Sequence, residues 1–184
     1  LQLVFDRASR RVLGLQAFGM MNDSISARVD AAAALIAQGG TIDDFAVVEM
    51  AYAPPFSSAI DSINAAAYVA ENLCDHRLRR VDLDRFLHWV SAMEIEPDWA
   101  VLDLRHPVES APFVEKFGAD RWIALEYSQV RARHAELPEG KTCIILCNAG
   151  TRSYEVQVFL DHIGKRDSMV LCGGLNVIAR MGVD

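Results

Sequence analysis

Several features that would define a function class are missing from this chain of 184 residues. No apolar run approaches the roughly 20 residues that a membrane-spanning helix needs. The chain opens on "LQLVF" rather than on a basic start followed by a long apolar core, so we predict no signal peptide. The net charge is −7 and no basic stripe is present, which argues against nucleic acid as a partner.

Metal-ligating patterns are missing as well. The cysteines stand at spacings that match no zinc pattern, and the five histidines are scattered, so we expect no metal. Because nothing indicates secretion, we expect reduced thiols and a cytoplasmic location, with one disulfide pair as the alternative. The cysteines are Cys74, Cys143, Cys147 and Cys172.

The glycine-rich fingerprint of dinucleotide-binding domains, G-x-G-x-x-G, does not occur either. The sequence begins at Leu1, inside a strand-like pattern, instead of at a methionine. We therefore expect a fragment of a longer protein.

The character of the sequence changes near residue 76. Before it, a hairpin over residues 1–20 precedes alanine-rich helices over 27–38 and 62–73. After it, short apolar strands alternate with helices of about ten residues, which predicts an α/β domain with a parallel sheet covered on both faces. We predict two domains, 1–75 and 76–184. The strands of the second are expected at 99–105, 121–125, 142–147 and 167–172, and its helices at 82–90, 107–117, 128–137, 151–163 and 175–181.

The segment "LCNAGTRSY" combines a cysteine, a strand end and a helix start. Cys147 ends a predicted strand, and the next helix begins between Gly150 and Ser153. A thiolate at that place meets unpaired backbone N–H groups and the positive end of a helix dipole, which lower the pKa of a cysteine. Gly150 suits a loop that turns its amides inward, and the guanidinium of Arg152 can contact an anionic sulfur.

This segment resembles the active-site loop of the rhodanese family, Cys-x-x-Gly-x-Arg-Ser, in which the cysteine carries a persulfide sulfur. "VLDLRHPVE" and "LCGG" are similar to the first core strand and the last Gly-Gly turn of that family, and the resemblance covers roughly residues 80–184. It implies a rhodanese-like sheet. The usual Gly-His-Ile-Pro-Gly-Ala segment is absent, and "GADRWIALEY" stands in its place. By this resemblance the persulfide loop comprises Cys147, Asn148, Ala149, Gly150, Thr151, Arg152 and Ser153.

Loop length separates two chemistries that this pattern serves. Four residues lie between Cys147 and Arg152, whereas the rhodanese-related phosphatases carry five and so form a ring wide enough for phosphate. Phosphatase is therefore the weaker alternative. Asp103 and Arg105 are interpreted as an ion pair that orients the strand end and the loop. His106 is interpreted as a surface residue, with a place in the pocket lining as the alternative. Cys74, Cys143 and Cys172 are interpreted as small buried hydrophobic residues.

The first half carries "EMAYAPPFSSAIDSINAAAYVAEN". It resembles the carboxy-terminal interface domain of the pyridine nucleotide–disulfide oxidoreductases, in the branch of CoA-disulfide and NADH-dependent persulfide reductases. The resemblance implies a smaller α+β dimerisation domain over residues 1–75, whose Tyr52 reaches across a dimer interface and protonates or orients a sulfur leaving group. The alternative for Tyr52 is an interface residue that anchors a proline turn. The matching residues are Tyr52, Pro54, Pro55, Phe56, Ser57, Asp61 and Asn64.

Together the two resemblances imply the C-terminal part of an FAD- and NAD(P)H-dependent CoA-disulfide or persulfide (polysulfide) reductase. Cys147 would carry sulfane sulfur as a persulfide and pass it to the reductase site. Expected donors are persulfide, polysulfide, thiosulfate or CoA persulfide, and the expected partner is a second copy, bound through residues 1–75. FAD, NAD(P)H and CoA are expected in the full-length protein and no cofactor in this part, which should show sulfurtransferase but no reductase activity. The alternative is a non-catalytic dimerisation and sulfur-docking module.

Overall fold

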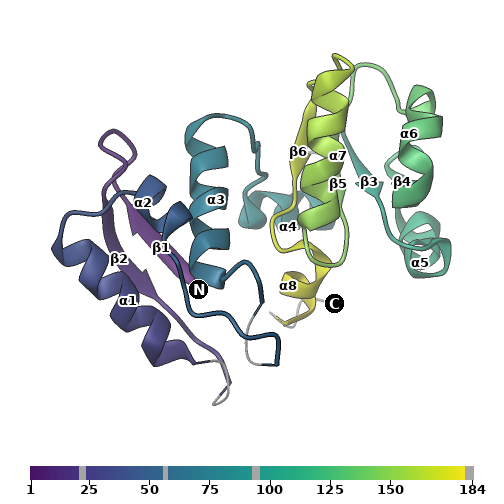
Figure 1. The fold of residues 1–184 in the computed structure, drawn as a ribbon. Coiled ribbons are helices and arrows are strands. Elements are labelled where there is room, and N and C mark those ends of the chain that lie inside the picture. The colour runs from purple at the N-terminus through teal and green to yellow at the C-terminus, as the bar shows by residue number, and fades with distance from the viewer. Residues whose placement is uncertain (21–23, 56–57, 93–95, 181–184) are drawn as a thin grey trace. The chain divides into compact units, whose positions relative to one another are not determined.

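The computed structural model of the chain describes residues 1–20, 24–55, 58–92 and 96–180. It divides into two compact units, Leu1–Arg77 and Leu78–Asp184, whose elements are labelled in Figure 1. The boundary lies two residues beyond the end of the predicted first domain. Among the described residues, no helix is both long and apolar enough to cross a membrane.

The first unit is a small α+β structure. Its two strands pair antiparallel, and alanine is among the buried residues of each of the two longer helices, Ala32 in the first and Ala67 and Ala70 in the second. A capping box between Thr41 and Asp44 opens the short middle helix, and the carboxylate of Asp61 caps the last helix by accepting from the Ile63 N–H. The elements are β1 (Gln2–Phe5), β2 (Val12–Gln16), α1 (Ile25–Ala37), α2 (Ile42–Val47) and α3 (Ser62–Cys74).

The second unit contains a four-stranded parallel sheet with the order β4-β3-β5-β6. Helices flank this sheet, so the predicted α/β class is confirmed. The strands are β3 (Trp99–Asp103), β4 (Trp122–Ala124), β5 (Thr142–Leu146) and β6 (Ser168–Val170). The helices are α4 (Leu83–Ala92), α5 (Pro107–Phe117), α6 (Val130–Arg133), α7 (Thr151–His162) and α8 (Gly174–Arg180), with 3-10 turns η1 (Tyr127–Gln129) and η2 (His134–Glu136).

One predicted helix is not continuous. The segment 128–137 forms a 3-10 turn, a single α-helical turn and a second 3-10 turn in place of one helix. Within the segment only Val130 and Leu137 are buried, which leaves it without the apolar stripe that a packed helix presents to a core.

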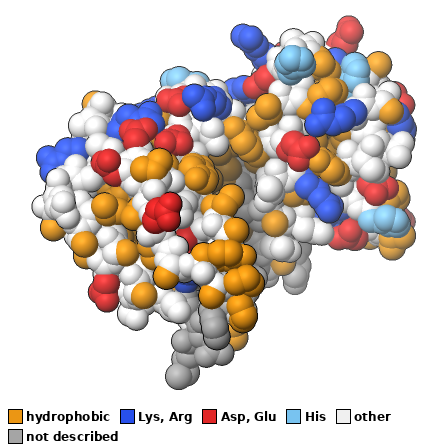
Figure 2. Space-filling view, in the orientation of Figure 1, with side chains coloured by type: hydrophobic (Ala, Val, Ile, Leu, Met, Phe, Trp, Pro, Cys, Tyr) orange, Lys and Arg blue, Asp and Glu red, His pale blue; other side chains and the backbone are white. Residues whose placement is uncertain are grey.

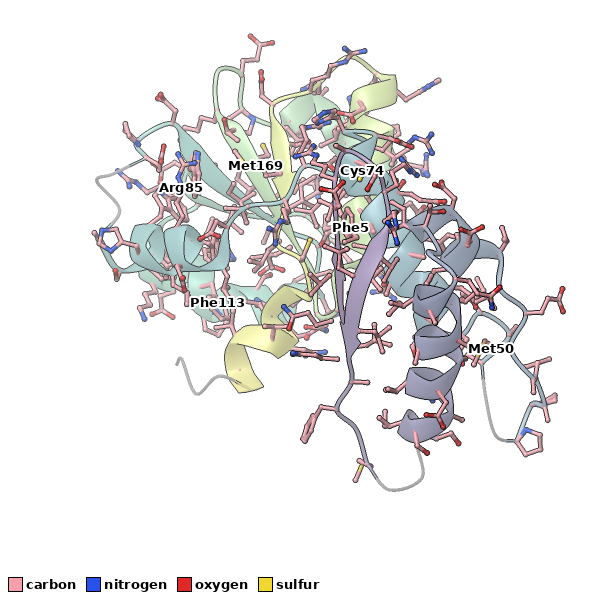
Figure 3. All side chains as sticks on the ribbon, turned by 90° about the vertical axis from the view of Figure 1, so that its left-hand side faces the viewer. Phe5, Met50, Cys74, Arg85, Phe113 and Met169 are labelled. Atoms are coloured by element: carbon pink, nitrogen blue, oxygen red, sulfur yellow. The ribbon has the colours of Figure 1, made fainter. Side chains whose placement is uncertain are left out.

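Alternating side chains of the central strands fill two separate cores. Val101, Ile144 and Leu146 belong to one, whereas Leu102 and Ile145 belong to the other. This alternation follows from the two-residue period of a strand, and burial on both faces explains why the strands read as continuous apolar runs. The first unit has a third core of its own. Figure 3 labels Phe5, Met50 and Cys74 at that core, and Phe113 and Met169 at the sheet.

Candidate functional site

Cys147 lies at the edge of the sheet where the parallel strands end. It directly follows β5, and the last residue of that strand, Leu146, pairs with Asp103 at the end of β3. The backbone N–H of Leu104 continues the pairing by donating to the Leu146 carbonyl at 2.9 Å. The sheet register therefore brings the cysteine loop and the Asp103–Arg105 segment side by side, at the edge where α/β proteins place their functional loops.

The loop wraps its amides around the sulfur of Cys147. The Gly150 N–H donates to Sγ at 3.1 Å, and α7 begins at the next residue, Thr151. Gly150 has φ +93°, and a β-carbon there would lie 2.9 Å from the backbone nitrogen of Gly173, so both conformation and space require glycine. The side chain of Cys147 is only 4% exposed.

The pKa of Cys147 is below that of an ordinary thiol. Burial is the largest influence and raises the pKa, because it disfavours the thiolate. The nearby hydroxyl of Ser153 and the N–H groups of Ser153, Ala149 and Gly150 lower it, and together they outweigh burial. The start of the helix thus stabilises a nucleophilic thiolate in a largely apolar setting.

Ser153 is completely buried in the first turn of α7. Its hydroxyl has no partner of normal hydrogen-bond geometry among the described residues, although it contributes to lowering the pKa of Cys147. Both observations fit a hydroxyl that faces the sulfur without a well-formed bond to it. A buried hydroxyl without a hydrogen-bond partner lowers the stability of the fold. The Ser153 hydroxyl is therefore a candidate hydrogen-bond donor to a further atom bound to the Cys147 sulfur.

Asp103 and Arg105 form a buried ion pair. The carboxylate of Asp103 accepts from Arg105 Nε at 2.9 Å and Nη2 at 2.6 Å, and also from Trp122 Nε1 at 3.0 Å. The Arg105 guanidinium lies 4.8 Å from the centre of the Phe113 ring. The pair ties the end of β3 to β4 and α5 beside the cysteine loop; that it orients the loop stays a prediction.

The turn after β6 supports the loop from the other side. Leu175 N–H donates to the Cys147 carbonyl and Asn176 N–H to the Asn148 carbonyl, each at 3.0 Å. A β-carbon on Gly174 would overlap the carbonyl oxygen of Cys147. The two consecutive glycines therefore permit a backbone contact that no larger residue allows.

A pocket of about 370 Å³ opens in front of the sulfur. Arg152 reaches it from α7, and its guanidinium lies 5.4 Å from the centre of the Tyr127 ring. Sequence reasoning assigned Arg152 to this site but gave no role to two acidic residues, Glu109 and Glu126. The lining residues are Leu104, Arg105, His106, Glu109, Glu126, Cys147, Asn148, Ala149 and Arg152.

Glu109 and Glu126 carried signals that sequence reasoning did not use. Glu109 stands in "HPVE", at the first turn of α5 that follows β3, and its Oε1 accepts from Asn148 Nδ2 at 3.1 Å. Glu126 follows β4 and precedes a 3-10 turn. Both positions come shortly after the end of a parallel strand, where residues of different loops converge.

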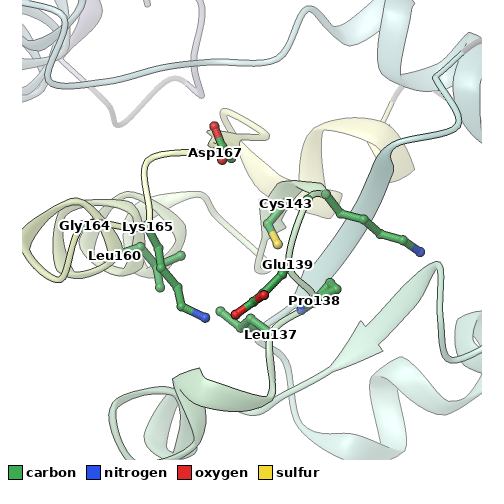
Figure 4. A pocket seen from close by; sticks show the side chains of 10 residues that line it. Leu137, Pro138, Glu139, Cys143, Leu160, Gly164, Lys165 and Asp167 are labelled. Carbon is green, nitrogen blue, oxygen red and sulfur yellow. The ribbon is translucent and has the colours of Figure 1, made fainter.

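The other thiols have different surroundings. Cys143, near the start of β5, is buried as predicted, and burial raises its pKa. It lines a pocket of about 230 Å³ at the opposite end of the strand from Cys147 (Figure 4). The prediction of burial was wrong for the other two. Cys172 is exposed because β6 ends at Val170, and Cys74, the last residue of α3, is half-buried.

His106 is exposed, as predicted, and it also lines the pocket. Its Nδ1 accepts from the Val108 N–H at 3.3 Å and so caps α5. Among the described residues, no group of three or more potential ligands from His, Cys, Asp and Glu could hold a metal ion.

Three known proteins are similar to this chain. A NAD-dependent persulfide reductase from A. fulgidus matches 94% of the chain with a TM-score of 0.72 and 28% identity. The reduced CoADR-RHD of Bacillus anthracis matches 95% with a TM-score of 0.72 and 26% identity. A CoA-dependent NAD(P)H sulfur oxidoreductase of Pyrococcus furiosus is 41% identical over 66 residues, or 36% of the chain. No family model matches.

The chain resembles part of the CoA-disulfide and persulfide reductases. The family resemblance that the sequence indicated, an interface domain followed by a rhodanese domain, is thereby confirmed. The chain spans 29% of the length of each of the two solved structures and 14% of the Pyrococcus furiosus protein.

In this reductase-like chain, Tyr52 belongs to the first unit and is 55% exposed. It lines a pocket of about 320 Å³ together with Asn64 and Tyr68. The Asn64 amide donates to the carbonyls of residues 45, 46 and 48, which holds the chain leading to Tyr52 against α3. Phe56 and Ser57 of the predicted pattern lie outside the described residues.

Proposed function

We propose that this chain is a sulfur-carrying part of a persulfide or CoA-disulfide reductase and that Cys147 holds the sulfur as a persulfide. The proposal is carried by the surroundings of the Cys147 sulfur. The sulfur accepts a hydrogen bond from a loop amide at the start of α7, and the pKa of the thiol is lowered. A thiolate is the form of cysteine that attacks sulfane sulfur.

The reaction has two balanced steps. The Cys147 thiolate attacks the outer sulfur of a donor R–S–SH; the S–S bond of the donor breaks, RS⁻ leaves, and Cys147–S–SH forms. An acceptor thiolate or cyanide then attacks that outer sulfur and regenerates the Cys147 thiolate. No net oxidation is needed, because the sulfur atom passes from one nucleophile to another at its own oxidation level.

The surrounding residues suit a persulfide more than a free thiol. A second sulfur enlarges the group and moves its negative charge outward from the Cys147 Sγ. The unpartnered hydroxyl of Ser153 and the guanidinium of Arg152 are the proposed contacts of this charge. Asp103 keeps Arg105 neutralised as an ion pair, so Arg152 is the cation left for the sulfur at this pocket.

The reductase half of the activity is proposed from the names of the similar proteins. The names of two similar proteins mention NAD, NAD(P)H and CoA. We therefore propose that a nicotinamide cofactor and CoA serve the sulfur acceptor in the full-length protein, and we propose FAD from the sequence resemblance to the pyridine nucleotide–disulfide oxidoreductases. We propose that residues 1–75 bind a second copy of the chain and that Tyr52 orients or protonates the leaving sulfur there. Figure 2 shows hydrophobic side chains on the surface of the first unit. The exposed large hydrophobic residues of this unit include Phe18, Val47, Tyr52, Ile60 and Tyr68.

Intact-mass analysis of the 184-residue chain tests the sulfur step. After treatment with glutathione persulfide we expect the mass to rise by one sulfur atom, and cyanide to remove that atom as thiocyanate. Cys147→Ser should abolish both results. Cys172→Ser is the matched control, because that thiol is exposed and should leave both results intact.

Three other outcomes are informative. Sulfur uptake that survives Cys147→Ser would place the nucleophile elsewhere. Uptake without release to cyanide would favour the docking module over a sulfurtransferase. Hydrolysis of an aryl phosphate by the wild-type chain would favour the phosphatase alternative.

A further inference from the structure

The pocket in front of Cys147 carries two carboxylates, those of Glu109 and Glu126, for which the described part of the chain provides no ion-pair partner. Glu109 and Glu126 form no ion pair with Lys or Arg in the described part of the chain. Among the described residues, the hydrogen-bond partner of the Glu109 side chain is Asn148, which is uncharged. A structural role for these acids would normally place a guanidinium or ammonium group against them, as it does for Asp103 and Asp161 of the same unit.

The positive charge available to oppose them is small. The pocket contains two guanidinium groups, those of Arg105 and Arg152. Arg105 is bound by both oxygens of Asp103, at 2.9 and 2.6 Å, so its charge is compensated inside the protein. An incoming molecule therefore meets three negative groups, the two carboxylates and the Cys147 thiolate. Of the two guanidinium groups, only that of Arg152 has a charge left to balance them.

We propose that Glu109 and Glu126 form a charge filter that selects the sulfur donor. The filter disfavours dianionic donors such as thiosulfate, and favours persulfides that carry no more than one negative charge at the reacting end. This inference rests on the proposed persulfide chemistry of Cys147 and names the class of donor for that same site.

The chemistry of the two donors explains the selection. With thiosulfate, the Cys147 thiolate attacks the outer sulfur, the S–S bond breaks and sulfite leaves with two negative charges. Both the entering and the leaving ion must pass the two carboxylates. With R–S–SH, the same bond breaks but RS⁻ leaves with a single charge at the sulfur. Since repulsion grows with the product of the charges, each carboxylate penalises thiosulfate more.

The test compares the second-order rate constants for loading Cys147 with thiosulfate and with glutathione persulfide. In the wild-type chain we expect thiosulfate to load at least about tenfold more slowly. The double variant Glu109→Gln with Glu126→Gln should raise the ratio of the thiosulfate constant to the persulfide constant roughly tenfold. Glutamine keeps the oxygen that accepts from Asn148, so the loop contact is preserved.

Glu139→Gln is the matched control. Glu139 is exposed, like Glu109, and belongs to the same unit, but it lies at the pocket beside Cys143, at the opposite end of β5 (Figure 4). Its neutralisation lowers the net negative charge of the chain without changing the pocket of Cys147. The donor ratio should stay at the wild-type value.

Ionic strength gives a readout that a merely structural role would not move. Salt screens repulsion between exposed charges, so thiosulfate loading of the wild-type chain should accelerate as salt rises. The acceleration should be much weaker in the double variant.

An unchanged donor ratio and an unchanged salt dependence in the double variant would overturn the filter, as would wild-type loading by thiosulfate at the persulfide rate. These results leave the persulfide role of Cys147 standing. Failure of glutathione persulfide to load the wild-type chain would instead overturn the proposed function, and the filter with it.

Discussion

The sulfur of Cys147 combines burial, which opposes its ionisation, with hydrogen bonds that favour it. The net lowering of its pKa therefore depends on donors that a single substitution can remove. Of these donors, only the Ser153 hydroxyl comes from a side chain; the others are backbone N–H groups of the loop. Ser153 is thus the residue at which the electrostatics of the site can be changed with the loop intact.

We expect Ser153→Ala to raise the pKa of Cys147. The thiolate form is stabilised by the hydroxyl, so its loss moves the midpoint of ionisation to higher pH and leaves less thiolate at neutral pH. The rate of alkylation by iodoacetamide, measured against pH, should show the higher midpoint and a fall of roughly threefold to tenfold at neutral pH.

Ser110→Ala is the control for this substitution. Ser110 is equally buried, and its hydroxyl donates to the Pro107 carbonyl, away from the sulfur. It should leave the alkylation profile of Cys147 unchanged. An identical midpoint in the Ser153→Ala variant would show that the backbone amides alone set the pKa.

At the scale of elements, the cysteine loop depends on its contact with the turn after β6. Gly174 has φ +60°, and a β-carbon there would overlap the backbone of Cys147 and Asn148. Gly174→Ala should therefore displace the loop and slow sulfur loading at least about tenfold, with a stability loss of about 1–3 kcal/mol from backbone strain and overlap.

Gly140→Ala separates the strain from the overlap. Gly140 also has positive φ, +73°, but no atom lies within 4 Å of the added β-carbon. Its variant should lose only about 1 kcal/mol in urea unfolding and keep normal loading. Equal loading rates in the two variants would contradict the role assigned to the contact between loop and turn.

The ion pair of Asp103 and Arg105 connects β3 with β4. Asp103→Asn removes the charge that compensates a buried guanidinium and weakens the bond from Trp122 Nε1. Breaking a buried pair from one side costs about 3–5 kcal/mol. We expect the free energy of unfolding of the second unit in urea to fall by this amount. Tryptophan fluorescence measures this unfolding.

An exposed pair on the same unit provides the comparison. Arg133 and Glu136 bond at 2.7 Å, but both side chains are about half exposed. Glu136→Gln should leave the unfolding curve nearly unchanged, because water and salt screen exposed pairs. A similar shift in both variants would mean that burial adds nothing to the pair at Asp103.

Local patterns predicted these elements well where each carried its own signal. Helix α3, predicted over 62–73, and the cysteine loop between β5 and α7 both follow from residues close in sequence. The carboxylates at the pocket could not be assigned in the same way. Glu109 and Glu126 come from different elements, and they meet Cys147 only because the sheet order places β3 between β4 and β5. The charge of this pocket depends on the order of the strands in the sheet, which no single segment of the sequence reveals.

The broken helix over 128–137 illustrates a second limit. Its composition suits a helix, yet only two of its residues, Val130 and Leu137, are buried, and the segment forms short turns. The burial of Cys172 was mispredicted for a related reason, since the strand ends two residues earlier than its apolar letters indicate. Propensity fixes the type of an element better than its ends.

The chain consists of two units: the first has one hydrophobic core and the second has two. Because separate cores can be lost separately, we expect two transitions on unfolding. The chain offers a direct way to observe one of them. All three tryptophans, Trp89, Trp99 and Trp122, lie in the second unit, so their fluorescence reports that unit alone. Far-UV circular dichroism reports helices of both.

Phe45→Ala tests this independence. Phe45 is completely buried in the core of the first unit, and its truncation should cost about 3–5 kcal/mol. We expect one circular-dichroism transition to move to lower urea while the tryptophan midpoint stays in place. Asp103→Asn should move the tryptophan midpoint to lower urea and leave the circular-dichroism transition of the first unit in place. If one variant moves both probes together, the two units unfold as one cooperative body, and a loss of stability in the first unit would then also reach the sulfur site.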